Sequence, residues 1–306
     1  MTCVESLPPL EDFVIENLGA ARLANLNNQS KGGDNNSKGN KHETFFATYK
    51  LAEMYVAHPE DDVEISSQEK AFVDDLIIRN FTKNSKQNYQ LKDAKAVYWQ
   101  KSKGISPYFR DQYKIDVEYF KVKDSKTILV LAQENVYKQR SKDIPNSIEH
   151  HTECVLFKNS ESANKMLLDN QSFKNAVEKF CAYPKDTDKL EIVLRNLVGA
   201  WTTHNKETRK VSEFISLAKE SANPNFFIDS NTNYSISSEL RLILDNIDEL
   251  SYTIKNGYLN YDIKSLSGIV RFKVNTPDFD ELSKAIIEKE PKDIMTLLGF
   301  LMGSRG

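Results

Sequence analysis

Four polar residues in the first third of the chain have the types and spacing that hydrolysis of a phosphodiester bond requires. They are Glu43, Asp75, Gln90 and Lys92. Carboxylate and amide oxygens suit a hard cation such as Mg²⁺, which keeps several of its own waters. Such a cation lowers the pKa of a bound water, and a lysine beside it can orient that water or stabilise charge on the phosphate. We therefore predict a metal-dependent site that uses Mg²⁺ or Mn²⁺.

The elements expected to carry these residues are one helix and three strands. Apolar residues recur every three or four positions in residues 42–58, which predicts a helix with Glu43 in its first turn. Strands are predicted at residues 63–68, 71–79 and 89–97. A polar turn over residues 82–88 indicates that the second and third strands pair as antiparallel neighbours.

Strand geometry predicts which of these side chains lie together. Positions i and i+2 of a strand point to the same face, so Gln90 and Lys92 project together. Tyr89 and Leu91 then face the core. The neighbouring strand can bring a carboxylate, from Asp74 or Asp75, beside Gln90 and Lys92.

This order of elements, with Glu, then Asp, then Gln-x-Lys, resembles the PD-(D/E)xK nuclease superfamily. Gln-x-Lys in place of Glu-x-Lys resembles its Mrr-like branch. Residues 39–46, 72–78 and 89–95 resemble the double-stranded DNA endonuclease effector domain of CBASS and Lamassu-type anti-phage systems. The resemblance covers about the first half of the chain, and residues 160–220 only loosely. Val73 stands where the family has the proline of its name.

The resemblance implies roles for individual residues. Asp75, Gln90 and Lys92 would form the metal and catalytic core, and Glu43 would support the metal or its waters. Asp74 is the alternative metal ligand. Asp75 is preferred because the family's aspartate precedes an apolar strand run, as Asp75 does here.

The resemblance also implies a function and partners. The chain would be a metal-dependent endonuclease for double-stranded DNA, the effector subunit of a bacterial anti-phage defence complex. In a Lamassu-type complex its partners would be an SMC-like ATPase and an accessory subunit. A homo-oligomer is expected when the enzyme is active, because one metal site of this kind cuts one strand at a time.

Each feature alone also has a simpler interpretation. A glutamate in a first helical turn commonly caps the helix, an aspartate pair can protect an edge strand, and Gln-x-Lys is usually a solvated strand face. Their coincidence in this order favours the nuclease. The alternatives are a non-catalytic adaptor that keeps the nuclease fold and a type IV restriction enzyme for modified DNA. The intact Lys92 argues against the adaptor, and no aromatic-cage pattern after residue 223 supports the second alternative.

The overall charge limits how the chain can bind DNA. With 41 basic and 44 acidic residues the net charge is −3, so nucleic acid is not attracted globally. Contact must come from a local patch or from partner subunits. The candidate patch follows the motif, interleaved with aromatic residues, and consists of Lys95, Lys101, Lys103 and Arg110. A solvated face over an aromatic core is an equally good interpretation.

The expected fold class is α/β, a restriction-endonuclease-like central mixed sheet flanked by helices, with a mostly helical C-terminal region. Three parts are expected. They are an N-terminal helical segment over residues 1–29, a nuclease domain over 30–222 and an interaction region over 223–306. In the last part, one amphipathic helix is predicted over residues 236–256.

Cysteine usage and hydropathy indicate the compartment. Cys3, Cys154 and Cys181 are far apart, so a disulfide framework or a zinc site is not expected, although His150 and His151 lie near Cys154. No stretch is long and apolar enough to span a membrane, and the N-terminus lacks a basic signal region. We expect a cytoplasmic protein.

Overall fold

The computed structural model describes residues 7–32, 40–67, 69–100, 104–205, 207–228, 234–263 and 266–303. The chain divides into two compact units, the first formed by Met1–Val177 with Leu194–Ser221 and the second by Glu178–Val193 with Ala222–Gly306. Within the described ranges, no helix combines the length and the apolar character that a membrane span needs. Cys3, Lys101 and Lys103 lie outside the described residues.

The first unit is built on a six-stranded sheet with the order β5-β4-β3-β2-β1-β6. Its strands are β1 (Val63–Ser66), β2 (Leu76–Asn80), β3 (Ser85–Lys92), β4 (Asp124–Leu131), β5 (Thr152–Leu156) and β6 (Arg209–Lys210). The first three strands pair antiparallel, whereas β4 and β5 continue parallel to β3. This mixed sheet, flanked by helices, confirms the predicted α/β class.

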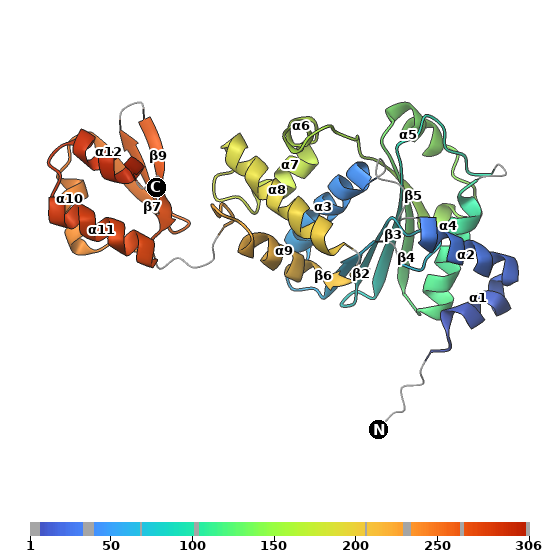
Figure 1. Ribbon diagram of the computed structural model, residues 1–306. Coiled ribbons are helices and arrows are strands. Elements are labelled where there is room, and N and C mark those ends of the chain that lie inside the picture. Colours follow the sequence, from blue (N-terminus) through green and yellow to red (C-terminus); the bar gives the residue numbers. More distant parts are fainter. Residues whose placement is uncertain are drawn as a thin grey trace, which may run out of the picture. The chain divides into compact units, whose positions relative to one another are not determined.

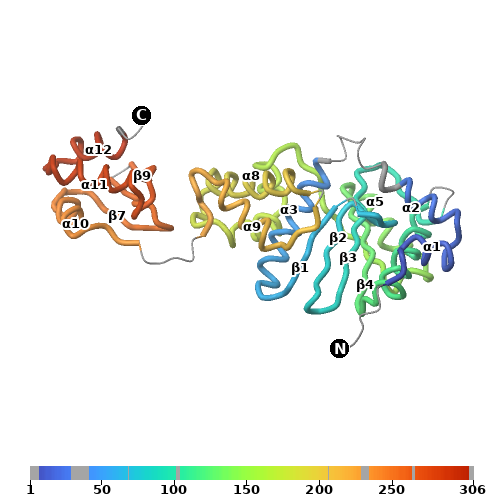
Figure 2. Tube along the Cα trace, turned by 60° about the horizontal axis from the view of Figure 1, so that its bottom comes forward, coloured from blue at the N-terminus to red at the C-terminus, as the bar shows by residue number. Residues whose placement is uncertain are grey.

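Helices cover both faces of this sheet (Figures 1 and 2). The helices before and between the strands are α1 (Leu10–Leu18), α2 (Ala20–Gly32), α3 (Asn40–Ala57), α4 (Ser106–Lys114) and α5 (Glu134–Arg140). Those after β5 are α6 (Ala163–Asp169), α7 (Gln171–Glu178), α8 (Thr187–His204) and α9 (Val211–Glu220). Helices α3 and α9 lie on one face, and α4, α1 and α2 lie on the other.

Aromatic and aliphatic side chains pack between the sheet and the helices on each of its two faces. On the α3 face, the rings of Phe46 and Tyr89 meet edge to face with centroids 5.2 Å apart. On the α4 face, Phe109 packs with Trp99 and with Leu129 of β4 in one buried cluster. The helix α3 therefore holds its position over β3 by aromatic packing as well as by its connection to β1.

The predicted strand over residues 71–79 is wrong in its first half. Residues 71–75 form bends, and β2 begins only at Leu76. The physical reason is the Asp75 carboxylate, whose Oδ2 accepts the backbone N–H of Leu91 at 2.6 Å, next to the Leu76–Tyr89 pair that ends the ladder. The Asp75 side chain thus accepts the N–H of Leu91, which the backbone of a further strand residue would otherwise accept.

The third strand starts earlier than predicted. Asn84 has φ of 50°, so the turn is short and β3 already begins at Ser85. The predicted antiparallel pairing of the second and third strands is confirmed. Residues 93–97, predicted to continue the strand, form a loop that leads toward α4.

On the α4 face of the sheet, two residues of β3 take part in a buried ionic network. The Nζ of Lys86 donates to Oδ1 of Asp116 at 2.5 Å, and Asn88 donates to Oδ2 at 2.6 Å. Gln112 and Ser125 donate to the same carboxylate at 2.9 and 2.7 Å. Lys86 and Asp116 are both buried, so the pair is satisfied entirely inside the protein.

Removing one partner of this network is expected to destabilise the fold strongly. In Asp116→Ala the Lys86 ammonium would stay buried without its counter-charge, which typically costs about 3–5 kcal/mol. Urea unfolding followed by circular dichroism measures this loss. A loss below about 1 kcal/mol would show that Lys86 escapes to solvent or finds another acceptor.

The second unit contains a three-stranded antiparallel sheet with the order β7-β8-β9. Its elements are α10 (Ser238–Asp245), β7 (Leu250–Lys255), β8 (Tyr258–Ile263), β9 (Leu266–Lys273), α11 (Pro277–Lys289) and α12 (Ile294–Gly303). Their apolar side chains share one core, which includes Leu240, Val270 and Leu297. The helical C-terminal region is therefore confirmed, and three strands accompany its helices.

The single helix predicted over residues 236–256 is wrong. It ends at Asp245, and β7 follows. Asn256 and Gly257 have φ of 57° and 81°, the left-handed conformations that a two-residue hairpin turn requires. This hairpin commits the preceding residues to a strand whose side chains alternate in burial.

Candidate active site

The first turn of α3, the start of β2 and the end of β3 meet at one edge of the sheet. Asp75 directly precedes β2, and Gln90 lies on β3 fifteen residues later. The amide Nε2 of Gln90 donates a short hydrogen bond to Oδ2 of Asp75. The same oxygen accepts the N–H of Leu91. Two neutral donors therefore orient the Asp75 carboxylate.

The strand β3 presents a polar row on one face. Lys86 and Asn88 bind Asp116 on that face, and Gln90 and Lys92 follow at the same two-residue spacing. Tyr89 and Leu91 are buried, as expected for the opposite face. In the described part of the chain, Lys92 makes no hydrogen bond or ion pair through its side chain. Its ammonium is therefore available to a ligand.

The charge of Asp75 acts on two neighbouring carboxylates of the site. Burial and then the charge of Asp75 raise the pKa of Glu43 to about 7, while the charge of Lys92 opposes the rise. The pKa of Asp74 is likewise raised to about 7, by burial and then by Asp75. Burial also raises the pKa of Asp75, against the charge of Lys92 and the two hydrogen bonds. Glu43, Asp74, Asp75 and Lys92 are thus close enough to interact electrostatically.

The donor set suits a hard cation. A bound positive ion would relieve the repulsion by which Asp75 raises the pKa of Glu43 and of Asp74. The Nε2 of Gln90 is used by Asp75, so its Oε1 remains for another partner. Among the residues that the structure describes, no three His, Cys, Asp or Glu side chains already converge on a metal position. Mg²⁺ commonly takes only one or two carboxylates and completes its shell with other oxygens.

The raised pKa of Glu43 predicts a pH-dependent stability. Because the folded pKa is about 7 and the ordinary value 4.5, the folded state holds an extra proton in between. Stability from this group is complete below the ordinary value and is lost as the pH rises through about 7. Glu43→Gln removes the titrating carboxyl group and therefore this loss of stability.

Without metal, we expect Glu43→Gln to be about 1–2 kcal/mol more stable than the wild type at pH 8. This figure is below the roughly 3.5 kcal/mol that ~1.4 kcal/mol per pKa unit gives for a shift from 4.5 to about 7, because Glu43 is partly exposed to solvent. At the ordinary pKa of a glutamate, 4.5, the two proteins should unfold alike. Urea unfolding in EDTA at both pH values measures this. Equal stability at pH 8 would show that Glu43 is solvated and not held against Asp75.

The predicted DNA-facing patch is only partly described. Lys95 is exposed in the loop after β3. Arg110 lies on α4 with its side chain 63% exposed, and its guanidinium bonds the neighbouring Asp111. Trp99 and Phe109, which alternate with these basic residues, belong to the core. Arg110 and Lys95 therefore sit on a solvated surface above an aromatic core.

Two residues beside the motif were not predicted from the sequence. His42 precedes Glu43, is buried, and its Nε2 lies 2.8 Å from the carbonyl oxygen of Phe157. Asp93 follows Lys92, and its carboxylate accepts hydrogen bonds from Gln133 and Asn159, each at 2.9 Å. Their adjacency to Glu43 and Lys92 was the only sequence signal, because their partners are remote in the chain.

The histidine pair near Cys154 has a structural role. The ring of His151 stacks on Tyr113 with centroids 4.1 Å apart, and its Nδ1 lies 3.0 Å from the Thr127 hydroxyl. Burial lowers the pKa of His151 to about 4, so the ring is neutral near pH 7. His151 is thus a core residue.

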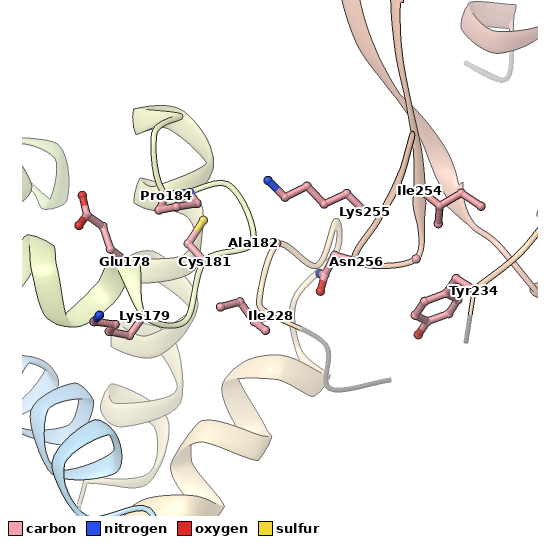
Figure 3. Close-up of a pocket in the computed structure, with 11 residues that line it drawn as sticks. Glu178, Lys179, Cys181, Ala182, Pro184, Ile228, Tyr234, Ile254, Lys255 and Asn256 are labelled. Carbon is pink, nitrogen blue, oxygen red and sulfur yellow. The ribbon is translucent and has the colours of Figure 1, made fainter. Parts of the chain in front are cut away.

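A hollow of about 620 Å³ in the second unit is chemically different from the site (Figure 3). The segment around Cys181 and the β7–β8 turn line it, and Lys179 and Lys255 are among the residues there. Burial raises the pKa of the Cys181 thiol, so the thiol stays protonated and is a poor nucleophile. The hollow holds none of the residues predicted to do chemistry.

Comparisons of the chain with protein-family models, with curated proteins and with solved structures find no match. The function must therefore be argued from the site itself. Its defining features are the bonded pair Asp75 and Gln90, the two further carboxylates, and Lys92.

Proposed function

We propose that this chain is a metal-dependent endonuclease that hydrolyses phosphodiester bonds of double-stranded DNA. The observation that carries the proposal is the hydrogen bond from Gln90 to Asp75, at the edge where Glu43 and Lys92 interact with the same carboxylate. Acidic and amide oxygens beside a lysine match the chemistry of cation-assisted attack on a phosphate. Asp75 is the proposed aspartate ligand, and Asp74 is the alternative.

Each of these residues would have its own role in hydrolysis. Asp75 and Gln90 would hold Mg²⁺ or Mn²⁺, and Glu43 would support the waters around it. The bound cation would supply an acidified water and neutralise charge on the phosphate. Lys92 would orient the attacking water and stabilise negative charge on the phosphate oxygens. The water gives its oxygen and one proton to the phosphate, and the sugar oxygen leaves with the other proton.

The similarity to PD-(D/E)xK nucleases supports a more specific proposal. The order of α3, β1, β2 and β3 is the order expected from the resemblance to the superfamily, and Gln90-x-Lys92 at the end of β3 resembles its Mrr-like branch. We propose a cytoplasmic effector of an anti-phage complex, with an SMC-like ATPase and an accessory subunit as partners. The net charge of −3 fits a subunit that relies on partners or self-association to engage DNA.

Cleavage of a supercoiled plasmid tests the proposal. The full chain, alone and with the products of neighbouring genes, is incubated with the plasmid in Mg²⁺ and in EDTA. Nicked and linear products are expected in Mg²⁺ only. No cleavage under any of these conditions, with DNA binding retained, would favour the non-catalytic adaptor instead.

A further inference from the structure

The segment of residues 157–161, which we call the bridging segment, directly follows β5. It is fixed to the sheet by the N–H of Phe157, which donates to the carbonyl of Leu131 at 3.0 Å. From this position it contacts the elements that carry Glu43 and Lys92. These two residues stand on different elements, so their separation depends on what joins those elements.

One side of the bridging segment holds the first turn of α3. The carbonyl oxygen of Phe157 lies 2.8 Å from Nε2 of His42. A carbonyl can only accept, so this nitrogen carries the proton. Both residues are buried, and their rings lie 5.8 Å apart. Lys41 also donates to the carbonyl of Glu161. Glu43 directly follows His42 in this turn.

The other side of the segment holds the end of β3. Asn159 donates through Nδ2 to Oδ2 of Asp93 at 2.9 Å. The Oδ1 of Asn159 accepts the N–H of Ser160 at 2.8 Å, which fixes the orientation of the amide. The second oxygen of Asp93 accepts from Gln133 at 2.9 Å. Lys92 is the residue directly before Asp93.

We propose that the bridging segment sets the distance between Glu43 and Lys92, and that His42 and Asp93 are positioning residues of the active site. The inference rests on the proposed function. His42 acts through Glu43 and Asp93 acts through Lys92, while neither needs to touch the substrate. The buried His42 contact carries the larger effect, because the contacts of Asp93 are exposed to solvent.

A matched pair of histidine variants tests this. His42→Ala and His151→Ala each delete a buried, hydrogen-bonded imidazole, but His151 precedes β5 whereas Phe157 follows it. Both should lose stability. Only His42→Ala should raise the Mg²⁺ concentration for half-maximal plasmid cleavage, by about 10- to 100-fold, as expected when a residue supporting a metal ligand is lost.

Two surface variants extend the test. Asp93→Ala should raise the same Mg²⁺ midpoint by a few fold, about threefold or more. Asp61→Ala, which removes a carboxylate bonded to Asn80 at the opposite end of β2, should leave the Mg²⁺ midpoint unchanged.

A rescue variant completes the set. His42→Gln should have a near-wild-type Mg²⁺ midpoint, because a glutamine amide can donate to the Phe157 carbonyl. Asp93→Ala carries the test if His42→Ala does not fold.

Hydrogen exchange separates this inference from the proposed function. In the absence of metal and DNA, the amides of residues 44–48 should exchange faster in His42→Ala than in His151→Ala. Equal exchange at these amides, or equal Mg²⁺ midpoints in an active enzyme, would overturn the bridging role. A wild type that cleaves no DNA would overturn the proposed function, and the exchange result would still decide the role of the segment.

Discussion

Asp75→Asn should abolish Mg²⁺-dependent cleavage, lowering the rate by about a thousandfold or more. The substitution preserves size and keeps an acceptor for the N–H of Leu91, so the local fold should persist. It removes the negative charge that a cation needs. The pKa of Asp75 is raised by burial, so losing that charge should not destabilise the metal-free protein.

Calorimetric titration with Mn²⁺ in the absence of DNA isolates the metal-binding part of this prediction. The wild type should bind and Asp75→Asn should not, while the Asp61→Asn control binds normally. Asp74→Asn should have a smaller effect, because the structure joins Asp75 and not Asp74 to Gln90. If Asp74→Asn eliminates binding and Asp75→Asn does not, the two aspartates exchange roles.

Lys92→Ala should lower the single-turnover cleavage rate by about 10²- to 10³-fold, the usual cost of removing one donor that stabilises developing charge. In the described part of the chain its side chain forms no hydrogen bond or ion pair, so its loss leaves no bonded partner unsatisfied. Arginine at this position should not restore the rate, because the planar guanidinium cannot replace a compact ammonium.

The equilibrium affinity for DNA distinguishes a chemical role of Lys92 from a binding role. Binding measured in Ca²⁺ should change by no more than about threefold, because one phosphate contact among several is lost. Lys138→Ala is the control, since Lys138 lies on the surface of α5 and is 67% exposed in its pair with Glu134. A loss of affinity equal to the loss of rate would assign Lys92 to DNA binding alone.

Local periodicity was enough to predict the helix that carries Glu43 and the strand that carries Gln90 and Lys92. The helix over residues 42–58 corresponds to α3, and alternation correctly separated Gln90 and Lys92 from the buried Tyr89 and Leu91. These features depend only on neighbours in sequence, so one chain suffices to find them. The mixed character of the sheet was expected from the resemblance to restriction endonucleases and not from periodicity.

The long-range contacts could not be predicted from the sequence. The Asp75 carboxylate ends the ladder by bonding Leu91, so a run that looked like a strand became a bend. His42 and Phe157 are 115 residues apart, and Asp93 and Asn159 are 66 apart. No spacing rule connects such pairs, because only the folded sheet brings the segment after β5 beside the first turn of α3 and the end of β3.

The error in the second unit had a different cause. The run ending at Lys255 has apolar residues compatible with both a helix and a strand. The dipeptide Asn256-Gly257 is a strong hairpin signal, and giving it more weight would have predicted β7 and β8. Turn chemistry should therefore outweigh periodicity where the two disagree.

Cleavage in water enriched in ¹⁸O tests the central claim most directly. A short duplex is cut by the wild type with Mg²⁺, and the products are weighed by mass spectrometry. If the site hydrolyses DNA, each cleaved bond should leave one terminal phosphate that carries one heavy oxygen and one unlabelled hydroxyl end. EDTA should prevent product formation, and Lys92→Ala should form product at least about 10²-fold more slowly. Terminal phosphates without the label, or labelled phosphates made as fast by Lys92→Ala, would contradict hydrolysis at this site.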